Sequence, residues 1–186
     1  MPNHDTPRPV GELFPVYYDE LRALAARRLS RERLNHTLRP TDLVHETYVV
    51  LSKNELLVAK DRAHFMGLAG YAMRQVLAQH ARRRGAAKRG GKRLRVTLDE
   101  ATAFIDGGSL DFLALDQAIT RLEEEDPRAA EVVQHRFFAG LNDAEIAGLM
   151  DYSERWVRQQ WRYAVLWLRR ELDPGVGPRT RRKKKS

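Results

Sequence analysis

The chain contains no cysteine, which excludes a disulfide framework and a zinc site built on thiolates. It has no long apolar run, and its first residues, MPNHDTPRPV, lack the apolar segment of a signal peptide. None of its six histidines belongs to an i, i+4 histidine pair of the kind that binds a metal. We therefore expect no metal, no cofactor and no membrane insertion, and a cytoplasmic location.

Acidic residues are absent from one stretch and crowded into the next. Between Arg74 and Arg95 there are nine Arg or Lys residues and no acid, whereas nine acids and one Arg lie between Asp99 and Asp126. The whole chain of 186 residues has a formal net charge of +8 and a pI near 10.0, which indicates a polyanionic partner.

Strand patterns are also lacking, and almost every strong pattern is helical. We expect helices over residues 13–29, 41–53, 63–84 and 111–124, a loop over 54–62, and a helix capped by Asp126 with Pro127 at its first position and Gly140 at its end. A glycine-rich segment separates the two halves, and a basic tail follows them. The sequence predicts an all-α chain: bundles over 10–85 and 111–172, a flexible linker over 86–110 and a tail over 173–186.

The segment from Asn142 to Leu168 has the pattern of two helices joined by a tight turn. Asn142 or Asp143 is placed to cap the first helix and Ser153 the second, because their side-chain oxygens accept from the open amides of a first turn. The outer face of the second helix carries Arg155, Arg158, Gln159 and Arg162. This pattern predicts a helix-turn-helix whose second helix reads the major groove. The alternative is a helical hairpin with a solvated charged face.

Three stretches of the chain resemble bacterial RNA polymerase sigma factors. The segment AITRLEEEDPRAAEVVQHRFFAGLNDAEIAGLMDYSERWVRQQWRYAVLWLRREL resembles sigma region four, and TDLVHETYVVL followed by HFMGLAGYAMRQVLAQHARRRG resembles region two. The order and spacing of these motifs, from about Glu12 to Leu172, are similar to those of the extracytoplasmic-function (ECF) sigma factors, which consist of these two domains.

The resemblance implies a non-enzymatic protein that binds core RNA polymerase, directs it to a promoter and opens the DNA. Region two would bind the β-prime clamp helices and the minus-ten element, and region four would bind the β flap and the minus-thirty-five element. The minus-thirty-five element, which lies upstream, would be read by the second helix of the helix-turn-helix through Arg155, Arg158, Gln159 and Arg162. Asp42, His45 and Glu46 would dock onto core polymerase.

One side of the expected helix 63–84 carries cations, amides and an aromatic ring, which suit phosphates and unpaired bases. These residues are Tyr71, Arg74, Gln75, Gln79, Arg82 and Arg83. We expect them to bind the minus-ten element. The loop 54–62 corresponds in the family to the segment that captures a base flipped from the melted strand.

The sequence departs from the family where Arg39, Pro40, Thr41 and Asp42 replace the usual Asp-Ala-Glu-Asp. Fewer acids should weaken docking onto the basic polymerase surface. Phosphorylation of Thr41 or Thr47 would restore negative charge at a helix start. The regulating partner would then be a serine/threonine kinase rather than an anti-sigma factor. Capping or packing is the alternative role for both threonines.

Two other function classes fit parts of the chain. An autonomous helix-turn-helix regulator would need its own dimer interface, and no apolar dimerisation stripe is evident. An enzyme acting on nucleic acid would need a carboxylate set or an activated nucleophile, whereas the acids cluster away from the basic segments.

Overall fold

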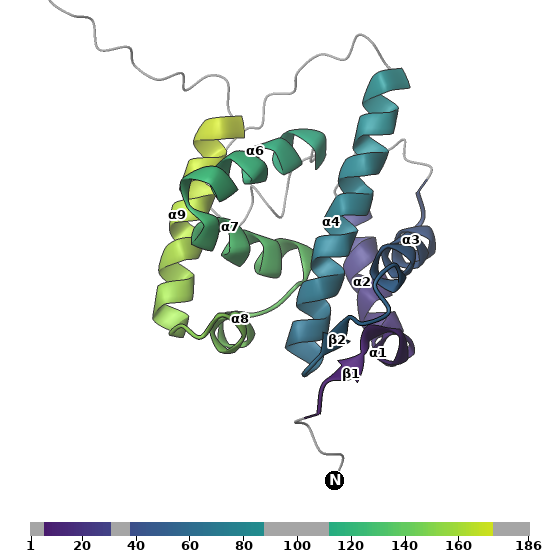
Figure 1. Cartoon of the computed structure of the whole chain (residues 1–186). Helices are drawn as coiled ribbons and strands as arrows, with labels where there is room; N and C mark the ends of the chain where they lie inside the picture. The colour runs from purple at the N-terminus through teal and green to yellow at the C-terminus, as the bar shows by residue number, and fades with distance from the viewer. Residues whose placement is uncertain (1–5, 31–37, 88–111, 173–186) are drawn as a thin grey trace, which may run out of the picture.

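Helices make up nearly all the regular structure of the computed structural model, which describes residues 6–30, 38–87 and 112–172. The amino-terminal half contains α1 (Val10–Val16), α2 (Tyr18–Leu29), α3 (Pro40–Ser52) and α4 (Arg62–Ala87). The carboxy-terminal half contains α6 (Phe112–Glu125), α7 (Pro127–Val133), the π-helical turn η1 (Gln134–Phe138), α8 (Asp143–Met150) and α9 (Glu154–Leu172). The all-α class is confirmed (Figure 1). Most of the predicted linker and the whole predicted tail lie outside the described residues.

Two details of the amino-terminal half differ from expectation. The single helix predicted over 13–29 is two helices, α1 and α2, that meet at Tyr17. Pro15, near the end of α1, has no N–H to donate, which disfavours a continuous helix there. A strand pair also exists, because β1 (Arg8–Pro9) pairs antiparallel with β2 (Val58–Ala59) inside the predicted loop. Strands of two residues are too short to leave a periodic pattern in the sequence.

The predicted caps of the carboxy-terminal half are confirmed. The Asp126 carboxylate accepts from the amides of Arg128 and Ala129 at 3.1 and 3.0 Å. Asn142 accepts from the Glu145 amide at 3.0 Å and Glu145 accepts from the Asn142 amide at 2.9 Å, a reciprocal capping box. The Ser153 hydroxyl accepts from the Trp156 amide at 3.2 Å. Such caps each stabilise a helix by about 1 kcal/mol.

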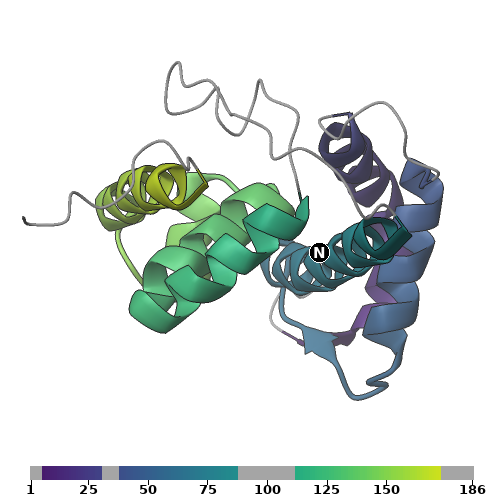
Figure 2. The same cartoon turned by 90° about the horizontal axis from the view of Figure 1, so that it is seen from above.

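Helix α4 lies between the two halves, with α1–α3 on one side and α6–α9 on the other (Figures 1 and 2). It packs against α3 and also against α6, η1 and α8. The buried residues of both halves form one continuous hydrophobic cluster. The two predicted bundles are therefore packed against each other, and α4 belongs to the contact between them.

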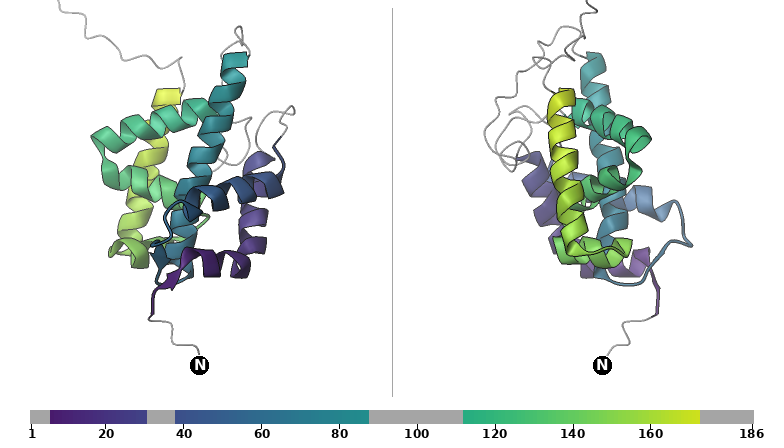
Figure 3. Two further views of the ribbon diagram at one scale, coloured as in Figure 1. Left: turned by 45° about the vertical axis from the view of Figure 1, so that its right-hand side comes forward. Right: turned by 90° about the vertical axis from the view of Figure 1, so that its left-hand side faces the viewer.

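Helix α9 lies on the far side of the carboxy-terminal half from α4 (Figures 1 and 3). Its inner stripe of Val157, Ala164, Val165 and Leu168 is buried. The contact between the halves consequently leaves the opposite face of α9 open.

Candidate nucleic-acid interface

The helix-turn-helix is formed by α8, a turn and α9. Asp151 ends α8 in the left-handed conformation, with φ of 58° and ψ of 48°, which aspartate tolerates better than most residues. The four predicted upstream-reading residues are exposed on α9, away from its buried stripe: Arg155, Arg158, Gln159 and Arg162. Three cations and an amide on one open helix face have the chemistry to bind phosphates and base edges.

Arg158 is the recognition residue whose position the protein constrains. Its guanidinium lies 3.2 Å from the Glu154 carboxylate and 3.8 Å from that of Asp143. Asp143 in turn pairs with Arg136, whose guanidinium lies 4.9 Å from the centre of the Trp161 ring. Within the described part of the chain, Arg155 and Arg162 have no acid within ion-pair distance. They can therefore bind an external anion without breaking an ion pair.

An aromatic stack beside the turn was not predicted from the sequence. The rings of Tyr152 and Trp156 stack with centroids 3.8 Å apart and planes 13° apart. The Arg128 guanidinium at the start of α7 lies 5.7 Å from the Tyr152 ring centre. This stack connects α7 to the start of α9, where the reading residues begin. A Tyr-x-x-x-Trp pair across a helix start is a weak sequence signal.

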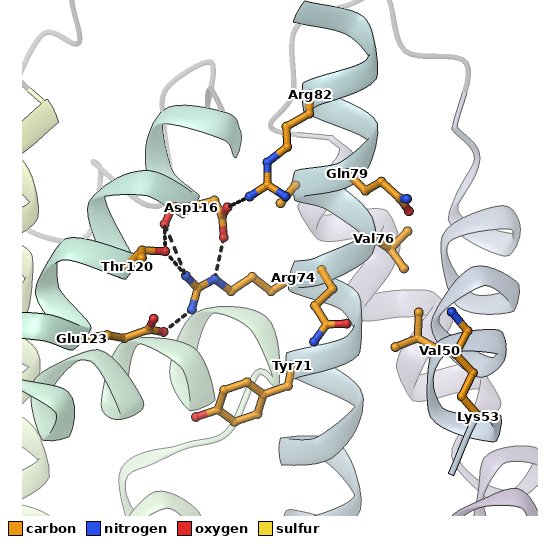
Figure 4. A pocket seen from close by; sticks show the side chains of 12 residues that line it. Val50, Lys53, Tyr71, Arg74, Val76, Gln79, Arg82, Asp116, Thr120 and Glu123 are labelled. Atoms are coloured by element: carbon orange, nitrogen blue, oxygen red, sulfur yellow. Dashed lines mark hydrogen bonds and ion pairs between the residues drawn. The ribbon is translucent and has the colours of Figure 1, made fainter.

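The predicted minus-ten residues share one face of α4, but they are not equally accessible (Figure 4). Tyr71, Gln75, Gln79, Arg82 and Arg83 are exposed, whereas Arg74 is only 8% exposed. All of them except Arg83 line, with parts of α3 and α6, a groove of about 770 Å³.

Acidic residues of α6 bind the cations of this α4 face. The Arg74 Nε donates to Asp116 Oδ1 at 2.9 Å, and its terminal nitrogens bind Glu123 and the Thr120 hydroxyl. Arg82 donates to the other Asp116 oxygen at 2.7 Å. Figure 4 shows both guanidinium groups directed at α6. These ion-pair partners were not predicted from the sequence.

The predicted base-capturing loop borders a smaller pocket of about 260 Å³, together with β1, the start of α1 and the end of α3. Residues from three places in the chain line it, including Val10, Tyr48, Leu51, Asn54 and Leu57. Asn54 stabilises the turn by accepting from the Leu56 amide at 3.1 Å, and the Leu56 side chain is 88% exposed. An apolar side chain so exposed on a loop is available to contact a base or a protein partner.

The predicted polymerase-docking residues lie on α3 in different environments. Asp42 accepts from the Arg39 amide at 3.0 Å, and Glu46 binds the His80 ring at 2.8 Å. His45 is exposed and lies at an apolar depression of about 540 Å³. Phe14, Pro15, Tyr18, Tyr48 and Val49 also line this depression. This exposed apolar surface on α1 and α3 was not predicted, because the sequence alone does not show which apolar residues of α3 are uncovered.

The two candidate phosphorylation sites differ sharply in exposure. Thr47 is fully buried, and its hydroxyl donates to the Leu43 carbonyl at 2.7 Å. Thr41 lies in the first turn of α3 and is half-buried. Only Thr41 has the partial exposure that a kinase would need.

His135 is buried where the two halves meet. Its ring is 5% exposed, packs edge-on against Tyr71 at 6.0 Å, and has its Nε2 3.7 Å from the Glu131 carboxylate. Burial lowers the pKa of His135 below its ordinary value, and His64 acts in the same direction while Glu131 opposes it.

We expect the free energy of unfolding to fall as the pH drops below about 6.5. In that range the unfolded chain binds a proton at His135 more readily than the folded chain does, because the folded-state pKa is depressed. Denaturant titrations across this pH range should show that the free energy of unfolding falls less for His135→Gln than for the wild type. The exposed His45→Gln is the control. An equal fall in His135→Gln would contradict the assignment.

Comparison with known proteins places the chain in a family. No curated protein and no solved structure matches it significantly. Among the described residues no group of His, Cys, Asp and Glu has the arrangement of a metal site, and none of their helices could cross a membrane. A family model described as ECF sigma factor matches residues 7–174, and the chain therefore belongs to the ECF sigma factor family.

Proposed function

We propose that this sigma factor uses the two halves of its structure as regions two and four. ECF sigma factors act in transcription initiation, where they bind core RNA polymerase and promoter DNA. In this proposal residues 10–85 form region two, residues 111–172 form region four, and the protein works in the bacterial cytoplasm beside the polymerase. The open cationic face of α9 is the observation that carries the proposal.

The minus-thirty-five element is assigned to α9. Arg155, Gln159 and Arg162 extend from an exposed face and have no side-chain partner among the residues that the structure describes, while Glu154 and Asp143 hold Arg158 in place. A helix of this kind enters the major groove with its first turns at the base edges. The Tyr152–Trp156 stack supports the start of this helix.

The minus-ten element is assigned to α4 and to the loop after α3. Gln75 and Gln79 can bind bases or phosphates, and Tyr71 offers a ring for stacking. The pocket bordered by Tyr48, Asn54 and Leu57 lies at the loop after α3 and has room for an extruded base. Extrusion costs a few kcal/mol, which such contacts must offset.

Core polymerase is assigned to the surface of α1 and α3. The apolar depression lined by His45 and Val49 has one acid in its lining, Asp19, and α3 carries Asp42 in its first turn, so this surface combines an apolar centre with acids. Interfaces commonly have an apolar centre and a polar rim. Co-purification tests the assignment, because a sigma factor binds core polymerase, a regulator binds duplex DNA alone and a nuclease degrades DNA.

Val49→Arg is expected to weaken core-polymerase binding by at least tenfold, because it places an unpaired charge at an apolar interface centre. The native side chain is 56% exposed, so the substitution leaves the fold intact. Ala144→Arg, on an exposed position of α8, is the matched control. Fluorescence titration with core polymerase measures both, and equal affinities would show that the α1–α3 surface is not the docking site.

Thr41 is assigned as an activating phosphorylation site. A phosphate adds about −1.5 to −2 charges at pH 7, here in the first turn of α3, where the helix dipole also favours an anion. Its position matches an acid that the family normally supplies and that this chain lacks. Restraint by an anti-sigma factor is the alternative mode of regulation.

Thr41→Glu is expected to raise core-polymerase affinity several-fold, and Arg39→Asp should do the same by restoring acidity at the start of α3. Thr47→Glu should instead destabilise the fold, because it buries a carboxylate without a partner. Titration with core polymerase and thermal unfolding measure the two effects. Tight binding by the unmodified protein, unaltered by Thr41→Glu, would contradict the phosphorylation switch.

A further inference from the structure

The surface of α4 that faces DNA in the proposed function is partly covered by α6, which buries Arg74 and binds Arg82. We propose that this structure is a closed, autoinhibited state in which the acids of α6 occupy the minus-ten binding face of α4. The inference rests on the assignment of the minus-ten element to α4. It identifies a further binding partner for that face, namely the chain's own α6.

Charge provides the first argument. Asp116 binds Arg74 and Arg82 together, and Glu123, two turns further along α6, binds Arg74 as well. Carboxylate oxygens thus take the positions at which phosphate oxygens would bind these guanidinium groups. The side chain of Arg74 is only 10% exposed, so it cannot contact DNA while this arrangement persists. DNA and α6 must therefore compete for the same cations.

The close approach of the backbones provides the second argument. A Cβ atom at Gly70 of α4 would lie 2.8–2.9 Å from the backbone and side chain of Ala139, which real Cβ atoms do not approach. At Gly67 it would lie 3.3 Å from His135 and Leu149. Two glycines one helical turn apart therefore allow the carboxy-terminal half to lie directly on α4. Glycine destabilises a helix interior by about 1 kcal/mol relative to alanine. The close contact with Ala139 and His135 gives a reason for glycine at both positions despite that cost.

Further contacts extend the covered surface beyond the ion pairs. The Arg62 guanidinium, at the start of α4, binds both Glu20 of α2 and Glu145 of α8. Arg28 of α2 lies 4.2 Å above the Phe137 ring. Contacts at both ends of α4 and from α2 hold the halves in one arrangement, whereas the α9 reading face stays open.

The closed state leaves a route by which DNA can displace α6. Gln75 and Gln79 line the groove and remain exposed, so a strand can bind there first. Further phosphates can then compete for Arg82, whose side chain is 62% exposed, before Arg74. A coupling of this kind typically changes affinity by five- to 150-fold.

Two sets of substitutions open the closed state without altering a residue that reads DNA. Asp116→Asn with Glu123→Gln removes the carboxylates from α6. Gly70→Ala acts sterically, forcing Ala139 away while favouring the α4 helix itself. Glu124→Gln controls the first set, because it removes an exposed carboxylate of α6 outside the contact. Gly148→Ala controls the second, because a Cβ atom there meets nothing within 4 Å.

The distance between the halves can be measured directly in the full-length chain. The absence of native cysteine allows spin labels at Ala26→Cys on α2 and Ala144→Cys on α8, both exposed positions. Pulsed electron paramagnetic resonance should give a narrow, short distance distribution for the wild type and both controls. Both opening variants should add longer distances. A distance distribution of the wild type that is as broad and as long as those of the opening variants would overturn the closed state.

The same proteins test inhibition. Affinity for a fluorescent random-sequence single strand of about 12 nucleotides should rise on the order of fivefold or more in the opening variants and stay unchanged in the controls. Opening without a rise in affinity would overturn autoinhibition. Failure of every protein to bind the strand, with the distances changing as expected, would contradict the minus-ten assignment instead. Agreement of the steric and the charge variants shows that opening, rather than lost stability, causes the effect.

Discussion

Alanine at all four reading positions of α9 is expected to remove most of the selectivity for the upstream promoter element while core-polymerase binding stays intact. The four side chains, Arg155, Arg158, Gln159 and Arg162, are exposed and point away from the buried stripe, so their loss leaves the fold unchanged. A good base-edge contact contributes about 1–3 kcal/mol of discrimination, so several lost contacts remove most of the specificity. Transcription from one promoter and from a version with a scrambled upstream element measures the effect.

Single substitutions separate base reading from phosphate binding. A cation that reads a base edge should relax selectivity at one base pair when replaced by alanine, whereas a cation that binds phosphate should weaken all sequences alike and lower the salt slope. Arg158 is the strongest candidate for base reading, because Glu154 holds its side chain in place. Unchanged selectivity and occupancy in the fourfold variant would mean that α9 does not read the promoter.

Tyr71→Ala combined with Gln75→Ala and Gln79→Ala is expected to prevent stable melting of the promoter. Stacking of one base on an aromatic ring contributes about 1–3 kcal/mol, and the two amides add contacts to the same strand. None of these three side chains belongs to the ion pairs with α6, so those ion pairs stay in place, although Tyr71→Ala removes the ring that packs against His135. Permanganate footprinting of the open complex reports the loss as weaker reactivity of unpaired thymines.

The Asp116→Asn, Glu123→Gln variant should give the opposite result in the permanganate assay, namely no loss of promoter melting. It keeps all the α4 residues and exposes them, so it should melt promoters at least as well as the wild type. Loss of core-polymerase binding in the α4 triple variant would show that this face binds protein rather than DNA.

Local signals account for the parts of the fold that the sequence predicted. Caps depend on one side chain and the amides two or three residues away, so Asp126, Asn142 and Ser153 were identifiable in advance. Apolar residues recur at helical spacing along α9, and four of them, Val157, Ala164, Val165 and Leu168, form its buried stripe. The reading face of α9 was predictable for the same reason, because it is the side opposite that stripe.

Contacts between distant segments account for what was missed. Arg74 looked like a free cation because its partner Asp116 lies on another helix. Gly67 and Gly70 resemble ordinary helix residues until Ala139 is placed against them. The same limit hid the apolar surface of α1 and α3, since exposure depends on which helices cover a residue rather than on its own neighbours in the chain.

Transcription in vitro with core RNA polymerase on a library of random promoters tests the central claim most directly. We expect start sites that depend on this protein and share an upstream and a downstream element, with α9 substitutions altering the first and α4 substitutions the second. Transcription unaffected by the protein, in its unmodified, Thr41→Glu and opened forms alike, would contradict the claim that this chain directs polymerase to promoters through these two surfaces.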